Sequence, residues 1–216
     1  MGFSIKSRLG SAPTLLNASR TTNFTYLVKG LQANDVKIIN NVNTRSKLKD
    51  RIKKIYDLGG WLEFETMDNP KFKKNLMMVD SVMPQIASRI LFAYFSSNKN
   101  SMTDLLTHLI NENYFDREAS FYEHKIKELL SAIALGMKPG TTWDGNEEAT
   151  GGYIIVKSSG DVLTYYIYNR DSFKKYLLNN TRLDSGSSSK HNYGTVYSDN
   201  DIHRIKLNLQ IRFNDN

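Results

Sequence analysis

Cysteine is absent from all 216 residues of the chain. Disulfide bonds, thiolate nucleophiles and cysteine-based zinc sites are therefore excluded. The chain has four histidines, and none has the spacing of metal ligands: His108, His124, His191 and His203. Reactive groups must therefore be sought mainly among hydroxyl, carboxylate, amide and cationic side chains.

Long apolar runs are also missing. No run approaches the roughly 18 residues that a membrane-spanning helix needs. Lys6 interrupts the region where a signal peptide would be apolar, so we expect no membrane partner. Apolar residues make up 40% of the chain and aromatic residues 11%, which excludes an intrinsically disordered protein.

The charge of the chain is positive and unevenly distributed. The net charge is +7. Residues 1–74 carry 14 lysines and arginines against 6 acidic residues, residues 75–152 carry 6 against 10, and residues 153–216 carry 9 against 6. Two basic flanks around an acidic centre favour a polyanionic partner such as nucleic acid. A basic protein without such a partner agrees with the charge equally well.

Hydrophobic periodicity divides the chain into three segments. Residues 1–75 predict strands and a basic helix, residues 76–138 predict helices, and residues 139–216 predict mainly strands. We expect an α+β or mixed α/β fold with β-rich ends, in which the segments form one compact unit. Within the first segment the expected elements are strands at 3–9, 24–28, 36–39 and 61–65 and a helix over 44–58.

Later elements follow from caps and turns. We expect helices that begin near Pro84, at Ser101 and near Arg117. A hairpin of strands 153–157 and 162–168 should follow, because Ser158-Ser159-Gly160-Asp161 is a turn sequence. The remaining expectations are a helix at 171–179, a polar loop at 183–192, and strands at 193–197 and 202–213.

Ser4-Ile5-Lys6 is the first motif with chemical meaning. On a strand, residues 4 and 6 face the same side, so a hydroxyl and an ammonium group lie together. Metal-dependent nucleases of the PD-(D/E)xK type have an acid-x-Lys strand in which the acid binds a metal ion that helps to generate hydroxide. Here Ser4 replaces the acid. From these residues alone, an ordinary surface strand is the favoured interpretation.

Longer phrases identify a family. The sequence GFSIKSRLGSAPTLLNASRTTNFTY at the start is similar to the HpaII family of type II restriction endonucleases. So are NLMMVDSVMPQIASRILFAYF, LGMKPGTTWDGNEEATGGYIIVKSSGDVLTYYIYNR and YLLNNTRLDSGSSSKHNYGTVYSDNDIHRIKLNLQIRF. The resemblance covers essentially the whole chain.

The resemblance implies an Mg²⁺-dependent endonuclease of the bacterial cytoplasm that cuts double-stranded DNA at a short palindrome such as CCGG. It implies Lys6 as the catalytic residue, with Ser4 beside it. A homodimer is one possible assembly, because a palindrome offers two sites of cleavage. The segments then become nuclease-like strands with a basic helix (1–75), a helical segment (76–138) and a DNA-recognition segment (139–216).

The resemblance also implies an incomplete nuclease core. Family members are longer and have an N-terminal portion before the GFSIKS strand, whereas Met1 directly precedes Gly2 here. We therefore expect a C-terminal portion that lacks the strand with the upstream acid and can be inactive alone. Phe3 and Ile5 should then be exposed.

Acids within the chain are weak candidates for the metal site. Glu63 and Glu65 lie two residues apart on an expected strand and share one face, although a solvated strand edge is the better interpretation. Asp80 suits a helix start and Asp161 suits a hairpin turn. The metal ligands therefore stay unassigned.

Polar residues on either side of the acidic centre are candidates for DNA contact. Small hydroxyl and amide groups suit phosphates, and cationic side chains can read guanine in the major groove. The first set is Ser7, Thr14, Asn17, Ser19 and Arg20, and the second is Thr181, Arg182, Ser188, Ser189, Lys190, His191, Gln210 and Arg212. Composition alone favours a capped turn for the first set and a flexible linker for the serine-rich stretch. The lysines of the helix at 45–54 are interpreted as a solvated face.

Three functions therefore compete. The leading one is a type II restriction endonuclease. The second is a DNA-binding module without nuclease activity, because the metal-binding acid is missing. The third is a basic structural or protein-interaction domain.

Overall fold

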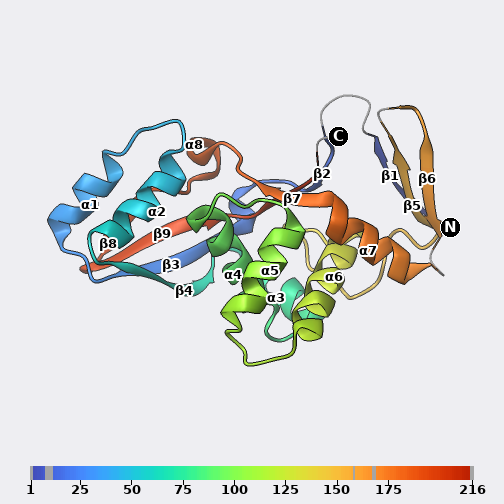
Figure 1. The fold of residues 1–216 in the computed structure, drawn as a ribbon, viewed down its shortest axis with the longest axis horizontal. Helices are drawn as coiled ribbons and strands as arrows, with labels where there is room; N and C mark the ends of the chain where they lie inside the picture. Colours follow the sequence, from blue (N-terminus) through green and yellow to red (C-terminus); the bar gives the residue numbers. More distant parts are fainter. Residues whose placement is uncertain (1, 8–11, 158, 167–168, 215–216) are drawn as a thin grey trace.

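The computed structural model describes residues 2–7, 12–157, 159–166 and 169–214. The helices are α1 (Ala33–Asn40), α2 (Lys47–Asp57), α3 (Pro70–Val79), α4 (Met83–Ser96), α5 (Met102–Glu112), α6 (Ala119–Leu135), α7 (Arg170–Asn180) and α8 (Ser188–His191), with the 3-10 turn η1 (Arg20–Thr22). The strands are β1 (Phe3–Ser7), β2 (Thr14–Leu16), β3 (Asn23–Lys29), β4 (Trp61–Met67), β5 (Gly152–Val156), β6 (Val162–Tyr166), β7 (Thr181–Asp184), β8 (Val196–Asp199), β9 (Ile202–Asn208) and β10 (Gln210–Phe213). The expected α+β class is confirmed (Figure 1).

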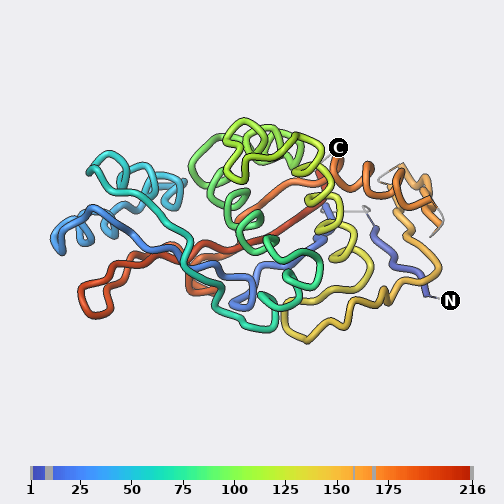
Figure 2. The backbone as a smooth tube through the Cα atoms, turned by 90° about the horizontal axis from the view of Figure 1, so that it is seen from below, coloured from blue at the N-terminus to red at the C-terminus, as the bar shows by residue number. Residues whose placement is uncertain are grey.

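The described strands form three small sheets. Their orders are β1-β5-β6, β2-β10-β7 and β4-β3-β9-β8. Strand β1 runs parallel to β5, whereas the other pairs are antiparallel. In Figures 1 and 2, α1 and α2 lie at one end of the long axis and β1, β5 and β6 lie at the other. Strands β9 and β10 follow each other directly and connect the second and third sheets.

Local signals account for most of the helices. The helix expected over 44–58 forms as α2, and the one expected near Pro84 forms as α4. Ser101 caps α5, because its hydroxyl accepts a hydrogen bond from the backbone N–H of Asp104 at 3.1 Å. The helix expected near Arg117 begins at Ala119 and ends before Gly136, as α6.

The helices α1 and α3 differ from the sequence-based expectation. The strand expected at 36–39 belongs to α1, because Asp35 accepts a hydrogen bond from the N–H of Gln32 at 2.8 Å and closes the first helical turn. The helix α3 was not expected. Asn69 caps it by accepting from the N–H of Lys71 at 2.8 Å, and Pro70 occupies its first turn.

The polar stretch 183–192 is more ordered than the loop expected there. Leu183 is buried in β7, and residues 188–191 form the short helix α8. The preceding Ser187 caps this helix, because its hydroxyl accepts a hydrogen bond from the N–H of Lys190 at 3.4 Å. Serine-rich composition therefore produces capping here rather than a linker.

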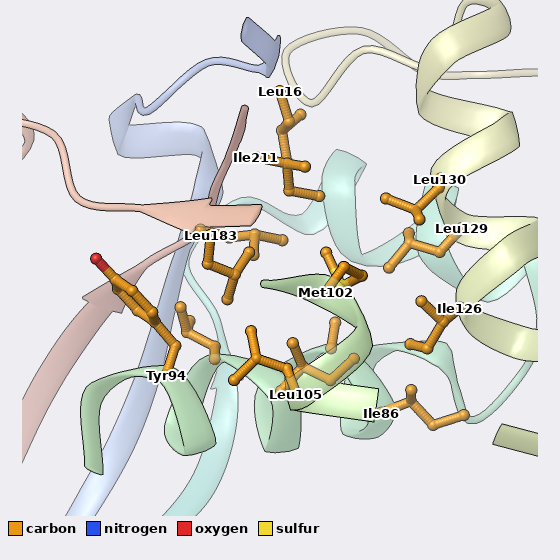
Figure 3. Packing of buried hydrophobic residues seen from close by; sticks show 14 of the residues in the cluster. Leu16, Ile86, Tyr94, Met102, Leu105, Ile126, Leu129, Leu130, Leu183 and Ile211 are labelled. Atoms are coloured by element: carbon orange, nitrogen blue, oxygen red, sulfur yellow. The ribbon is translucent and has the colours of Figure 1, made fainter. Parts of the chain in front are cut away.

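The core joins helices to the second sheet. Figure 3 shows Leu16, Leu183 and Ile211 from β2, β7 and β10 facing Met102 and Leu105 of α5. Ile126, Leu129 and Leu130 of α6 close the other side. Buried side chains from residues 1–75, 76–138 and 139–216 all contribute to one hydrophobic cluster.

The described helices differ in length and apolar composition from a membrane-spanning helix. None of them alone is long and apolar enough, and only α3 and α4 together reach the required length and composition, with a bend of 106° between them.

The first sheet presents two different faces. In the parallel register Ser4 lies opposite Tyr153 and Lys6 opposite Ile155, and this face is partly or fully buried. The opposite face exposes Phe3 by 38% and Ile5 by 64%, as expected. The alternation therefore turns the hydroxyl and the ammonium group of the motif toward the body of the protein.

Candidate active site

Ser4 and Lys6 line an open pocket of about 470 Å³. Its walls come from β1, from the loop after β2, from the end of α6 and from the loop that precedes β5. The residues expected at the site that line it are Ser4, Lys6, Asn17 and Ser19. The fold therefore joins the Ser-x-Lys strand to part of the first set of DNA-contact candidates.

The ammonium group of Lys6 is held in place at the pocket wall. Its Nζ donates a hydrogen bond to the carbonyl oxygen of Thr14 at 3.1 Å, and the residue is half-buried. Burial lowers the pKa of Lys6 from the ordinary lysine value, because the ammonium loses water. No carboxylate of the described residues forms an ion pair with it, so its charge is available to a bound anion.

Ser4 lies beside a buried phenol. Tyr153 is completely buried, and its ring packs against Phe173 with centroids 4.9 Å apart. Burial raises the pKa of Tyr153, and the neighbouring Ser4 hydroxyl partly opposes that shift. Ser4 therefore lies between the pocket and the buried Tyr153. The side chains of an ordinary surface strand would face only solvent on that side.

Glu148 is a pocket residue that the sequence analysis missed. It is the only acidic residue among the described residues that line the pocket. Its carboxylate accepts two hydrogen bonds from Nζ of Lys138 at 2.8 and 2.9 Å, and its backbone N–H donates to the carbonyl of Leu135 at 2.8 Å. The sequence signal that could have identified Glu148 is its position shortly before β5, the strand that pairs with β1.

The loop after β2 supplies small polar groups. Asn17 is exposed, and Ser19 caps η1 by accepting from the N–H of Thr21 at 3.2 Å. Arg20 is exposed on the same turn. Thr14 contributes its carbonyl to Lys6, whereas Ser7 lies on the outer face of β1 together with Ile5. The loop therefore places amide and hydroxyl groups next to the Lys6 pocket.

A buried amide network fixes this loop. The side-chain amide of Asn208, which is completely buried, donates to the carbonyl of Ser19 at 2.6 Å and to Oδ1 of Asn23 at 2.6 Å. A third contact reaches Oγ1 of Thr22 at 3.1 Å. Asn23 in turn donates to the carbonyl of His191 at 3.0 Å. One network therefore connects the two loops that carry candidate DNA contacts.

The two loops also touch directly. A Cβ added at Gly186 would lie 2.7 Å from the Cβ of Ala18, so only glycine permits this approach. Lys190 and Ser189 are exposed on the adjoining α8, and Ser188 and His191 are partly exposed. The serine-rich loop therefore extends the polar surface that begins at the Lys6 pocket.

Four other candidates belong to the second sheet, and three of them make internal side-chain hydrogen bonds. Thr181 is completely buried, and its hydroxyl donates to the carbonyl of Leu177 at 2.8 Å. Arg182 donates to the carbonyl of Phe213 at 2.7 Å, and Arg212 donates to the carbonyl of Ala12 at 2.8 Å. Gln210 is partly buried opposite Asp184. These side chains stabilise the sheet, and they lie outside the Lys6 pocket.

The weak metal candidates lie away from Lys6. Glu63 and Glu65 are on β4 and line a different pocket. Glu65 accepts two hydrogen bonds from Arg204 at 2.8 and 2.9 Å, which lowers its carboxyl pKa, and Glu63 accepts from Nε1 of Trp61 at 2.8 Å. Within the described residues no group of three or more His, Asp or Glu is arranged to hold a metal ion.

Asp161 lies in the hairpin connection as its sequence position predicts, whereas Asp80 lies between α3 and α4 without capping α4, whose N-cap is Val82. The carboxylate of Asp80 accepts from the N–H of Val82 at 3.0 Å and pairs with Lys125. Asp161 accepts from the hydroxyl of Ser159 at 2.9 Å in the hairpin connection. Neither acid lines the Lys6 pocket.

Two comparisons with known proteins find the same family of restriction enzymes. The family model of the HpaII restriction endonuclease matches residues 1–213. The type II restriction enzyme HpaII of Haemophilus parainfluenzae is 42% identical over 217 residues, which is 99% of this chain and 60% of that enzyme. The chain therefore spans about three fifths of the length of this relative. No solved structure matches the chain.

Proposed function

Since this chain belongs to the HpaII restriction endonuclease family, we propose that it acts as a type II restriction endonuclease on duplex DNA. The substrate we propose is DNA with a short palindrome of the CCGG kind. The enzyme would act in the bacterial cytoplasm as a homodimer, in which each subunit cuts one strand. The observation that carries this proposal is the Lys6 ammonium, which lies in an open pocket beside hydroxyl and amide groups and has no carboxylate partner among the described residues. Such a site suits a phosphodiester.

In the proposed reaction Lys6 stabilises the negative charge that develops on the scissile phosphate. Its ammonium already donates to the Thr14 carbonyl, so the group is fixed before the substrate arrives. Asn17 and Ser19 donate to neighbouring phosphate oxygens and orient the strand. Ser4, on the same face of β1, positions water at the pocket floor.

Magnesium is the metal we propose. It prefers oxygen ligands and binds through one or two carboxylates together with substrate phosphates and water. Glu148 offers one carboxylate in the pocket, and the Ser4 hydroxyl offers a further oxygen. Substrate phosphates and water would supply the remaining ligands. When bound, magnesium would neutralise phosphate charge and lower the pKa of a water molecule.

A DNA-binding module without nuclease activity is the second candidate. The single carboxylate among the described pocket residues is also the partner of Lys138, which favours this alternative over a complete metal site. In this case the loops around Ser19 and Ser189 would hold duplex DNA, and no bond would be cut.

Metal removal separates the two functions. We expect duplex DNA that contains CCGG to be cut in the presence of Mg²⁺ and to stay intact when EDTA removes the metal. Gel electrophoresis of the products measures the cleavage, and a duplex without the site is the control. Salt-dependent binding without any cleavage would support the module, and neither binding nor cleavage would contradict both functions.

The variant Glu148→Gln tests the metal site. We expect the Mg²⁺ concentration for half-maximal cleavage to rise about tenfold, because a carboxylate ligand becomes a neutral amide. The ion pair with Lys138 is exposed, so its loss should change the free energy of unfolding by less than about 1 kcal/mol. The neighbouring Glu147→Gln, which breaks a bond to Arg170 outside the pocket, is the control. Equal Mg²⁺ requirements in both variants would remove Glu148 from the site.

A further inference from the structure

A second cavity lies between the start of α2 and the serine-rich loop. Its volume is about 400 Å³. Three cationic residues line one wall, namely Arg45, Lys47 and Lys49, and serines line the other, namely Ser185, Ser187, Ser188 and Ser189. We call it the serine–lysine cavity. Figure 1 shows α8 beside the end of α2 that carries these cations.

The cations of this cavity are not neutralised within the described part of the chain. None of the described lining residues is acidic, and Arg45, Lys47 and Lys49 form no ion pair with a described residue. Two acids are close in sequence to the lining residues: Asp50 accepts from the hydroxyl of Thr44, and Asp184 accepts from Arg212 at 3.4 Å. The cavity therefore concentrates positive charge that an anion would balance.

Lys49 lies at the edge of the cavity, and its ammonium group is held against the end of α4 by Ser97, which lines a neighbouring cavity. Nζ of Lys49 donates to the carbonyl of Ser97 at 2.7 Å and lies 5.0 Å from the ring centre of Tyr94. Figure 3 shows the Tyr94 hydroxyl turned away from the packed aliphatic side chains. Burial lowers the pKa of Lys49, as expected for an ammonium group that has lost water without gaining a carboxylate.

The cavity is connected to the Lys6 pocket through contacts already described. Gly186 lines the cavity and approaches Ala18, which follows Asn17 of the Lys6 pocket. The two sites are separated along the long axis of the molecule, because β1 and α2 lie toward opposite ends (Figure 1). A duplex with its scissile phosphate at Lys6 would therefore place a different phosphate at the cavity.

We propose that the serine–lysine cavity binds a backbone phosphate of duplex DNA outside the cleavage site. This inference rests on the proposed function, and it gives the basic start of α2 a role that composition did not favour. Serine hydroxyl groups on one wall and guanidinium and ammonium groups on the other are the donors that contact phosphate oxygens in protein–DNA interfaces. The contact carries no base information, so it adds affinity without sequence preference.

The double variant Arg45→Gln and Lys47→Gln tests the proposal. We expect its Kd for a CCGG duplex, measured without metal at low salt, to rise about tenfold. The slope of log K against log salt should become shallower by about 0.9, because one phosphate contact is lost. The matched control is Lys53→Gln with Lys54→Gln, which removes the same amount of charge from α2 outside this cavity.

The outcomes separate this inference from the proposed function. An unchanged slope, or equal losses in the test and control variants, would overturn the cavity as a phosphate site while wild-type cleavage still supports the enzyme. Wild-type protein that binds no duplex would overturn both. The variant Arg45→Lys with Lys47→Arg keeps both charges and should bind like the wild type. A loss in this variant equal to that in the Gln variant would show that the lost charge is not the cause and would contradict the proposal.

Discussion

Replacing Lys6 by alanine is expected to lower the cleavage rate about a thousandfold at saturating Mg²⁺. The reason is electrostatic, because a preorganised cation that stabilises transition-state charge typically contributes 10²–10³-fold or more. The rate should be measured in single turnover on a CCGG duplex, which excludes product release from the comparison. Binding of the uncut duplex should weaken by less than about tenfold, since other side chains hold the backbone.

The pH profile adds a second test of Lys6. Burial lowers the pKa of this lysine, so the ammonium form is lost at a lower pH than in an ordinary lysine. If the positive charge is needed, wild-type cleavage falls as the pH rises through that lowered pKa. The variant Lys6→Arg keeps its charge, so it should retain more activity than Lys6→Ala and should lose this alkaline decline.

The control for Lys6 is a lysine with the same formal charge far from the pocket. Lys37 is exposed on α1, at the other end of the molecule (Figure 1), and Lys37→Ala should cleave like the wild type. A Lys6→Ala protein that cuts DNA at more than a tenth of the wild-type rate would contradict the assignment of Lys6 as the catalytic residue.

Replacing Asn208 by leucine is expected to destabilise the protein by about 3 kcal/mol. The side chains have similar volume, but leucine leaves Oδ1 of the buried Asn23 without this donor, whereas the carbonyl of Ser19 still accepts from Thr22. Unpaired buried polar groups cost about 1–3 kcal/mol each. The free energy of unfolding in urea measures the change, and Tm should fall by roughly 6–12 °C.

The same variant should also affect both candidate loops. Asn23, which Asn208 orients, donates to His191. We therefore expect faster amide hydrogen exchange in residues 17–22 and 186–192 than in the wild type. Asn111→Ala, at an exposed position of α5, should change stability by less than about 0.5 kcal/mol. If Asn208→Leu exchanges like the wild type in both loops, the network does not position them.

Sequence patterns predicted those elements whose signals are local. Ser101 predicts the start of α5 because its cap needs only the next three residues, and alternation predicts β1 because its two faces meet different surroundings. The prediction of a strand at 36–39 was wrong because the deciding signal lies outside those four residues. The apolar residues of 36–39 alone fit a strand as well as a helix, and the cap that decides the outcome involves Gln32 and Asp35.

The candidate site was predictable only in part. The Ser4 and Lys6 face followed from strand geometry and family resemblance, but Glu148 reaches the pocket through a parallel pairing between strands about 150 residues apart. Arg212 shows the opposite case. Its charge suggested a DNA contact, whereas the folded chain directs the guanidinium group to the carbonyl of Ala12. Neighbouring residues in the sequence predict neither the position of Glu148 in the pocket nor the bond from Arg212 to Ala12.

The bond between Asn208 and Ser19 has a consequence for the order of events during synthesis. The two residues are separated by 189 positions, and β9 and β10 are the last strands of the fold. A ribosome-bound chain that lacks them cannot hold the loop beside Lys6 in this way, because β10, the strand that pairs with β2, does not yet exist and β3 is paired with β4 alone. The nascent protein would therefore acquire its candidate active site only after β9 and β10 have been synthesised.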